Sequence, residues 1–177
     1  MTLEFKLDLP LTNALSAENQ QNTVFDAAIL GGGPAGMTAA VYALRKQMNV
    51  VMITPDLGGQ ILKTSGVENY MGYQYITGPE LSAKFSEQIR QFPLTLLQGE
   101  SVLSLSQGAD NVFLIATDSQ RTLKSRTVIL ATGKRWRKLN VPGEETYLGH
   151  GVVYCAVCDA PFFKGLPVVV AGGGNSA

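Results

Sequence analysis

The alternation of apolar and polar positions predicts a strand, a turn, a helix and a second strand in the first third of the chain. Residues 25–30 and 50–53 are almost continuously apolar, which is typical of buried strands. Between them, a glycine turn at 31–36 leads into residues 37–46, where apolar residues recur at the spacing of one helix face. Residues 25–54 therefore predict a βαβ unit with parallel strands and helices covering the sheet.

The later pattern predicts one more helix and a series of short strands. Apolar residues that recur every four positions predict a helix from Gly78 to about Phe92, and residues 55–79 show no clear period and predict a long loop. Two further buried strands are predicted at 127–131 and 167–171. Short alternating runs predict an antiparallel meander inserted into the parallel fold, at 95–97, 101–105, 111–117 and 121–124.

These elements predict an α/β chain. It contains a Rossmann-like dinucleotide-binding domain with an inserted antiparallel β-meander, and the start of a second Rossmann-like domain. We expect a lead-in at 1–23, the first part of the first domain at 24–133, a hinge at 134–140 and the start of the second domain at 141–177. Because the last strand is followed by a glycine loop and by no helix to cover it, we expect the chain to be part of a longer protein.

Composition and charge narrow the classes of function. The 14 Lys and Arg residues balance the 14 Asp and Glu residues, so no net charge attracts nucleic acid or an anionic membrane. The densest basic run, at 134–138, is interpreted as a solvated connector. No apolar stretch approaches the about 18–20 residues of a membrane span, and residues 1–23 lack the pattern of an export signal. We therefore expect a cytoplasmic protein, in which paired cysteines are typically catalytic or metal-binding.

The first glycine cluster matches the dinucleotide fingerprint G-x-G-x-x-G at Gly31, Gly33 and Gly36. In this strand–turn–helix setting, the first glycine permits the turn, the second lets the backbone approach a pyrophosphate, and the third allows close packing of helix and strand. The helix N-terminus then offers N–H groups to the phosphates. A ribose carboxylate is expected about 20 residues further on, where Asp56 either reaches back to the ribose or is only a turn residue.

A second fingerprint, with alanine in its third place, is formed by Gly172, Gly174 and Ala177. Two such loops in one chain indicate two dinucleotides, one in each domain, and the alternative is two unrelated glycine turns. A pair of dinucleotides suits an enzyme that passes electrons from a nicotinamide to a flavin.

Cys155 and Cys158 are the only cysteines, and Asp159 follows them directly. Their C-x-x-C spacing allows a disulfide across one turn and favours a reactive thiolate at one partner. A zinc site would need two more ligands, whereas the only histidine, His150, is interpreted as a loop residue, so we expect no metal. Asp159 is either an acid or base in dithiol–disulfide exchange or a turn residue before Pro161.

In this order, the motifs resemble those of the low-molecular-weight thioredoxin reductases across nearly all of residues 24–177. The matching segments are the two fingerprints, the cysteine motif and short runs at 58–60, 67–70, 78–81, 131–133 and 141–145. The resemblance implies that the first domain binds FAD and that the second is a nicotinamide domain. The FAD-binding residues that it implies are Gly31, Gly33, Pro34, Ala35, Gly36, Thr54, Gly59, Gln60, Asn69, Ala131, Thr132 and Gly133.

The resemblance also implies a route for the electrons. They pass from NADPH to FAD, then to the disulfide, and then to thioredoxin, with Cys158 facing the flavin, Cys155 attacking the partner and Asp159 serving as acid or base. The nicotinamide domain of this family swings relative to the flavin domain, and residues 134–140 correspond to one arm of that hinge. The family is usually homodimeric, and we expect residues 1–177 alone to be inactive.

Three alternatives to this function stay open. Residues 153–155 and 161–165 resemble the flavoprotein component of alkyl hydroperoxide reductase, which favours a peroxiredoxin or another redoxin as partner. Residues 1–23, however, are too short for the N-terminal redox domain of that component. The residues that select NADPH are expected beyond Ala177, so NADH or ferredoxin is an alternative donor. A non-enzymatic flavin-binding sensor is a third alternative, which the retained cysteine motif disfavours.

Overall fold

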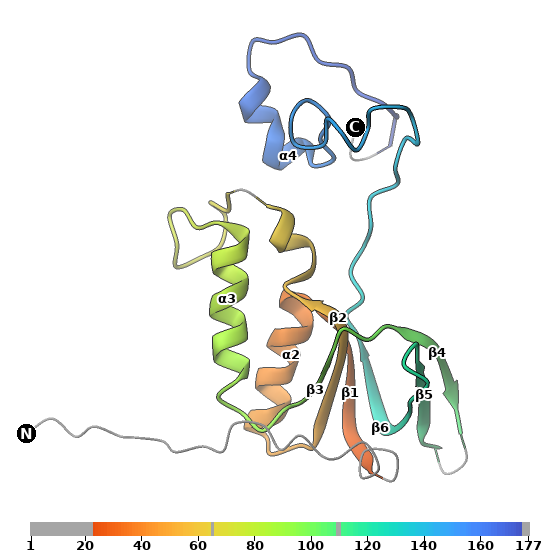
Figure 1. Cartoon of the computed structure of the whole chain (residues 1–177). Coiled ribbons are helices and arrows are strands. Elements are labelled where there is room, and N and C mark those ends of the chain that lie inside the picture. The colour runs from red at the N-terminus through yellow and green to blue at the C-terminus, as the bar shows by residue number, and fades with distance from the viewer. Residues whose placement is uncertain (1–22, 65, 109–110, 175–177) are drawn as a thin grey trace, which may run out of the picture. The chain divides into compact units, whose positions relative to one another are not determined.

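The structure, a computed structural model, describes residues 23–64, 66–108 and 111–174 (Figure 1). It divides into two compact units, residues 1–133 and 134–177, and each is described by itself. Nearly all of the predicted lead-in and Ala177 of the second fingerprint lie outside the described residues, as do the side chains of Val157 and Cys158.

The predicted βαβ unit is present and forms the centre of the first unit. β1 (Val24–Gly32) leads through the glycine turn into α2 (Pro34–Arg45), and β2 (Val50–Leu57) follows and pairs with β1 in parallel. Successive residues of β1 enter two different core clusters, Ile29 the first and Leu30 the second. This division follows because neighbouring strand side chains point to opposite faces of a sheet.

Six strands among the described residues form one sheet in the order β3-β2-β1-β6-β5-β4. The later strands are β3 (Thr95–Gln98), β4 (Val102–Gln107), β5 (Phe113–Thr117) and β6 (Thr122–Leu130). The strands β3, β2, β1 and β6 are parallel, whereas β6, β5 and β4 form an antiparallel meander. The predicted fold class, a Rossmann-like α/β sheet with an antiparallel meander, is confirmed.

Two details of the predicted strands are wrong. The run at 95–97 belongs to β3 and extends the parallel sheet beside β2, so it is no part of the meander. The runs at 121–124 and 127–131 join into the single strand β6, which pairs with both β1 and β5. The polar residues between the two runs conceal this continuity, yet Ser125 is buried and donates a hydrogen bond to the carbonyl oxygen of Thr127 at 2.7 Å.

The end of β6 and the segment 167–170 are more exposed than predicted. Leu130 is 68% exposed, because β5 accompanies β6 only as far as Ser125 and beyond that point β1 is its one described neighbour. Residues 167–170 form no strand, and Val169 is 97% exposed. A strand needs a hydrogen-bonding neighbour for stability, and within the described residues this segment has none.

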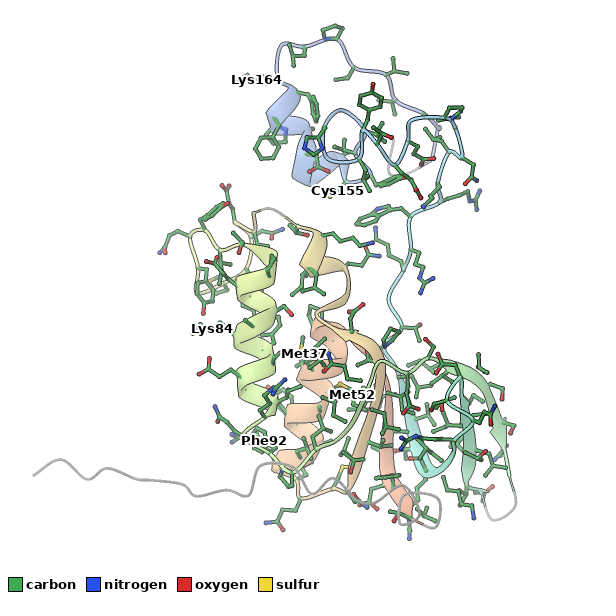
Figure 2. The ribbon with its side chains drawn as sticks, in the orientation of Figure 1. Met37, Met52, Lys84, Phe92, Cys155 and Lys164 are labelled. Atoms are coloured by element: carbon green, nitrogen blue, oxygen red, sulfur yellow. The ribbon has the colours of Figure 1, made fainter. Side chains whose placement is uncertain are left out.

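The second predicted helix is α3 (Gly78–Ile89), which begins with a capping box. The Thr77 hydroxyl accepts from the Glu80 N–H, and the Glu80 carboxylate accepts from the Thr77 N–H at 3.0 Å. Figure 1 shows α2 and α3 beside each other on one face of the sheet. Met37 of α2, labelled in Figure 2, and Ile89 of α3 belong to the core cluster beneath them.

The second unit consists mostly of turns. Its regular elements among the described residues are α4 (Ala156–Asp159) and the 3-10 helix η3 (Ala160–Phe163), which directly follow Cys155. Among the helices of the described part of the chain, none has the length and apolar character that crossing a membrane requires.

Candidate functional site

Three loops of the first unit meet at the carboxyl ends of neighbouring parallel strands. The glycine turn follows β1, residues 54–58 end β2 and lead into the 3-10 helix η1 (Gly59–Lys63), and residues 131–133 follow β6. In open α/β sheets, ligands bind at this edge, because the loops that follow parallel strands gather there.

Backbone contacts hold these loops against one another. The Ala131 N–H donates to the carbonyl oxygen of Leu30 at 2.9 Å, and the Gly58 N–H donates to that of Gly32 at 2.8 Å. Gly31 has a φ of +113°, and a Cβ at this position would lie 2.3 Å from the Ala131 carbonyl oxygen. Both the backbone conformation and the close approach therefore require glycine at position 31.

The other two fingerprint glycines differ in their surroundings. A Cβ at Gly36 would lie 1.9 Å from the carbonyl oxygen of Gly31, so α2 approaches β1 closely only because this position is glycine. A Cβ at Gly33 would have no neighbour nearer than the carbonyl oxygen of Gly58, at 4.0 Å. Gly59 faces Gly33 from the second loop, since a Cβ on Gly59 would lie 3.4 Å from the Gly33 Cα. We call the space at the Gly33–Gly59 contact the glycine cradle.

The N-terminus of α2 lies at this glycine cradle. Gly33 is the N-cap and makes no side-chain cap, Pro34 begins the helix, and the first turn holds no acidic residue. The first intrahelical bond runs from the Met37 N–H to the Gly33 carbonyl oxygen at 3.0 Å, so the N–H groups of Ala35 and Gly36 have no acceptor within the helix. Uncapped N–H groups, a positive dipole end and an open cradle fit the pyrophosphate of FAD.

Thr54 ties the ends of β1 and β2 together. It is 2% exposed, and its hydroxyl accepts from the Gly32 N–H at 2.8 Å and donates to the Asp56 carbonyl oxygen at 2.6 Å. The exposed carboxylate of Asp56 accepts from the Gly59 N–H at 2.8 Å, which favours the turn interpretation of this residue over a ribose contact. The flavin contact of Thr54 stays a prediction, because its hydroxyl is hydrogen-bonded to backbone groups of Gly32 and Asp56.

Gln60 and Asn69 lie on different parts of the segment between β2 and α3. Gln60 belongs to η1, directly after Gly59, and its Oε1 is buried. Asn69 is exposed on the loop that the backbone pair of Val67 and Ile76 closes. Gln60 therefore lies next to the glycine cradle, because it directly follows Gly59. The flavin contacts of Gln60 and Asn69 stay predictions.

The cysteine motif lies in the second unit (Figure 2). Cys155 is disulfide-bonded and only partly exposed, and its carbonyl oxygen accepts from the Asp159 N–H at 2.9 Å, which closes the single turn of α4. The side chain of Cys158 lies outside the described residues, so the pairing with Cys155 stays a prediction. His150 is exposed, with its Nδ1 3.2 Å from the Leu148 carbonyl oxygen, as expected of a loop residue.

The second fingerprint has no formed loop–helix structure in the described residues. A Cβ at Gly172 or Gly174 would meet no atom within 4 Å, and both residues are exposed. Nucleotide binding at these positions stays a prediction.

A second cluster, to which the sequence analysis assigned no role, surrounds the residue before Cys155. Glu144 is 4% exposed, and its carboxylate accepts from the N–H groups of Leu139 and Asn140 and from the Tyr154 hydroxyl. The bond from Tyr154 lowers the pKa of Glu144, and the same bond to the carboxylate raises the pKa of Tyr154. Two signals were available: Glu144 lies in the matching segment 141–145, and Tyr154 lies directly before a candidate catalytic cysteine.

The chain is similar to known proteins. Residues 25–177 match the family model for pyridine nucleotide-disulphide oxidoreductases. The chain is 42% identical over 180 residues to the F subunit of alkyl hydroperoxide reductase of Xanthomonas campestris pv. phaseoli, covering 99% of this chain and 34% of that protein. It is 38% identical over 176 residues to a protein named NADH dehydrogenase of Bacillus subtilis (strain 168), again covering 99% of this chain and 34% of that protein.

A solved structure of thioredoxin reductase from Streptococcus pyogenes MGAS5005 is also similar. Its TM-score is 0.72 at 43% identity, with 80% of this chain and 46% of that chain covered. The chain thus spans about a third of the length of the two curated relatives and less than half of the solved structure. The resemblance to thioredoxin reductases that the motifs predicted is confirmed.

Proposed function

Because the chain belongs to the pyridine nucleotide-disulphide oxidoreductase family, we propose that it is part of a flavoprotein disulfide reductase that transfers electrons from NADPH through FAD and the Cys155–Cys158 pair to thioredoxin. The observation that carries this proposal is the disulfide-bonded Cys155 at the start of a C-x-x-C-Asp motif. It lies in the same chain as a glycine cradle that fits a dinucleotide.

The first unit supplies the proposed FAD site. The N–H groups of Ala35 and Gly36 would donate to the pyrophosphate, and the open space at Gly33 would leave room for it. The loops at 54–60 and 131–133 would border the rest of the cofactor. When bound, FAD would relay an electron pair between a reduced pyridine nucleotide and a disulfide. The chain's own residues would bind and orient this group, and the backbone contacts of Gly32 with Gly58 and of Leu30 with Ala131 hold the surrounding loops against one another.

The second unit supplies the proposed exchange chemistry. Two electrons and two protons convert the Cys155–Cys158 disulfide into a dithiol. The Cys155 thiolate then attacks one sulfur of the redoxin disulfide and releases the other as a thiolate. Cys158 attacks the resulting mixed disulfide, which restores the original disulfide and releases the redoxin dithiol. Asp159, which closes the turn of α4 through its N–H, is proposed to hold or deliver the proton during these exchanges.

A peroxiredoxin or a related redoxin is a second candidate for the partner. The similarity to the F subunit of alkyl hydroperoxide reductase extends over 99% of the chain and favours it. The relative named NADH dehydrogenase makes NADH a second candidate for the donor. Reduced ferredoxin is the third candidate, carried over from the alternatives that the sequence left open. We further propose that the functional protein is a homodimer.

The function is tested on the full-length protein. We expect a yellow protein whose flavin is reduced by NADPH faster than by NADH or reduced ferredoxin, and which then reduces thioredoxin. Cys158→Ser and Cys155→Ser should each abolish thioredoxin reduction while retaining bound flavin and the reduction of ferricyanide, which takes electrons directly from flavin. A colourless full-length protein would overturn the proposal. Rapid reduction of a peroxiredoxin but not of thioredoxin would assign the second partner.

A further inference from the structure

A cluster of side chains in the second unit holds the residue that precedes Cys155. We call Trp136, Glu144 and Tyr154 the Tyr154 clamp. It connects three stretches of chain, since Trp136 belongs to the connector at 134–140, Glu144 to the turn after it, and Tyr154 to the approach to α4. None of the three belongs to the fingerprints or to the cysteine pair.

Glu144 holds the hydroxyl end of Tyr154. Its buried carboxylate accepts from the Leu139 N–H at 2.8 Å, from the Asn140 N–H at 2.6 Å and from the Tyr154 hydroxyl. Hydrogen bonds to an ionised acceptor are stronger than neutral ones, and three of them fix both carboxylate oxygens. The Tyr154 hydroxyl is thereby anchored to the backbone of the connector.

Trp136 holds the face of the same ring. The two ring centroids are 5.9 Å apart with an interplanar angle of 12°, and the Lys134 Nζ lies 5.1 Å from the Trp136 centroid. Stacking and a cation over an aromatic face are both attractive. Tyr154 is therefore restrained at two places, along its face and at its hydroxyl.

Two restraints on the Tyr154 ring limit how far its backbone can move, and the next backbone atoms are those of Cys155. The Cys155 carbonyl oxygen is in turn fixed by the Asp159 N–H, which closes α4. Thiol–disulfide exchange depends on how the attacking sulfur is directed toward the sulfur that it attacks. The Cys155 backbone is thus held on its N-terminal side by the clamp and on its C-terminal side by the helical turn.

We propose that Tyr154 is a positioning residue, and that its contacts with Glu144 and Trp136 direct the Cys155 sulfur for closure of the disulfide with Cys158. This inference rests on the proposed function only in taking Cys155 and Cys158 as the exchanging pair. It needs neither a flavin nor an identified redoxin.

The test uses the flavin-free protein, reduced with dithiothreitol, desalted without oxygen and mixed with 5,5′-dithiobis(2-nitrobenzoate). The first thionitrobenzoate is released when one thiol attacks the reagent, and the second when the other cysteine closes the disulfide. We expect Tyr154→Phe to slow the second release by on the order of tenfold, the size expected for losing a hydrogen bond to a carboxylate, and to leave the first release unchanged.

Three further variants make the test specific. Glu144→Gln should slow the second release as Tyr154→Phe does, and the double variant should be no slower than the slower single variant, because the two residues act through one contact. Tyr147→Phe alters an exposed tyrosine of the same unit and should change neither release. The emission of Trp136, the only tryptophan of the chain, checks that each variant is folded.

Several results would overturn the inference. An unchanged second release in Tyr154→Phe would show that the clamp does not direct Cys155, and equal slowing of both releases would show a general loss of access instead of positioning. A wild-type protein that releases no second thionitrobenzoate would also contradict it. Failure of NADPH, NADH and ferredoxin to reduce a flavin would contradict the proposed function alone, because these releases need no flavin.

Discussion

At the scale of single residues, Gly33 and Gly36 belong to one fingerprint but have different physical roles. Gly36 lies where α2 touches β1, with the position of a Cβ only 1.9 Å from the Gly31 carbonyl oxygen. Gly33 lies at the open glycine cradle and has an ordinary φ of −73°, and the nearest atom to a Cβ there would be the Gly58 carbonyl oxygen at 4.0 Å. We therefore expect Gly36 to be needed for the packing of α2 on β1, and Gly33 to be needed for the close approach of a ligand.

This difference predicts that two equally small substitutions affect different properties, Gly36→Ala mainly stability and Gly33→Ala mainly FAD binding. Gly36→Ala should lower the free energy of unfolding of the flavin-free protein by about 1–3 kcal/mol, since helix or strand must shift to relieve a backbone overlap. Gly33→Ala should lower it by about 1 kcal/mol, because alanine is a poorer N-cap than glycine, and should weaken FAD binding by roughly tenfold or more. Urea unfolding and flavin fluorescence titration measure the two quantities. Equal stability losses in both variants would contradict the assignment.

At the scale of elements, the ends of β1 and β2 are joined by one buried side chain. The Thr54 hydroxyl satisfies the Gly32 N–H and the Asp56 carbonyl oxygen at the point where the register of the β1–β2 pair shifts. At this irregular end of the β1–β2 pair, the Thr54 hydroxyl makes hydrogen bonds that backbone groups alone would make in a regular pair of strands.

Replacing this hydroxyl by a methyl group should therefore destabilise the first unit. Thr54→Val keeps the shape of the side chain but leaves the buried Gly32 N–H without an acceptor, and we expect a loss of about 1–3 kcal/mol in the free energy of unfolding. Thr54→Ser is the matched control, since it retains the hydroxyl and should lose less. A Thr54→Val variant as stable as Thr54→Ser, measured by urea unfolding, would show that the two bonds contribute nothing.

The elements also show which parts of the fold can be predicted from local sequence. The βαβ unit and α3 were predictable because periodicity, the glycine turn and Pro79 are all local signals. The pairing of β3 and the continuity of β6 were not, because each depends on a distant neighbour, as when the Ser125 hydroxyl contacts the Phe25 carbonyl oxygen. Local burial patterns are decided by such tertiary partners.

Some contacts of the candidate site could also be predicted from the sequence, and others could not. The close approaches at Gly31 and Gly36 follow from a fingerprint whose spacing has a known steric meaning. The contact between Glu144 and Tyr154 follows no spacing rule, since it depends on how the turns of the second unit bring the two side chains together. The sequence could therefore locate the cysteine pair, but not the contact between Glu144 and Tyr154 beside it.

At the scale of the whole molecule, the chain places its two candidate chemistries on separate units. The glycine cradle belongs to residues 1–133, and the cysteine motif and the Tyr154 clamp belong to residues 134–177. Trp136 is the only tryptophan, so its fluorescence reports on the second unit. This allows the acid stability of that unit to be followed by itself.

We predict that the second unit loses stability as the pH falls below 4.5, the ordinary pKa of a glutamate. The Tyr154 hydroxyl, and then the Leu139 and Asn140 N–H groups, lower the folded-state pKa of Glu144. Its stabilising contribution is therefore complete above the unfolded value and is lost as the pH falls through the lowered folded value. Glu145 adds to this through its bond with Lys138, which lowers its pKa as well.

The measurement is the urea midpoint of Trp136 fluorescence from about pH 6 to pH 3. Glu144→Gln should make the fall of this midpoint with decreasing pH shallower, because the titrating group is gone. Glu87→Gln changes an exposed glutamate of the first unit and should leave the slope as in the unaltered protein. Identical slopes in all three proteins would mean that Glu144 does not contribute to the acid sensitivity.

The place of β6 in the sheet also affects how the protein folds during its synthesis. β6 is the neighbour of β1, yet the chain must be extended from residue 32 to residue 122 before β6 even begins. At about 5–20 residues per second, translation of that stretch takes about 5–18 s. Throughout this interval the nascent β1 has an open edge that other strands can pair with. We therefore expect faster translation of residues 33–130 to raise the amount of protein that reaches its folded form in a cell.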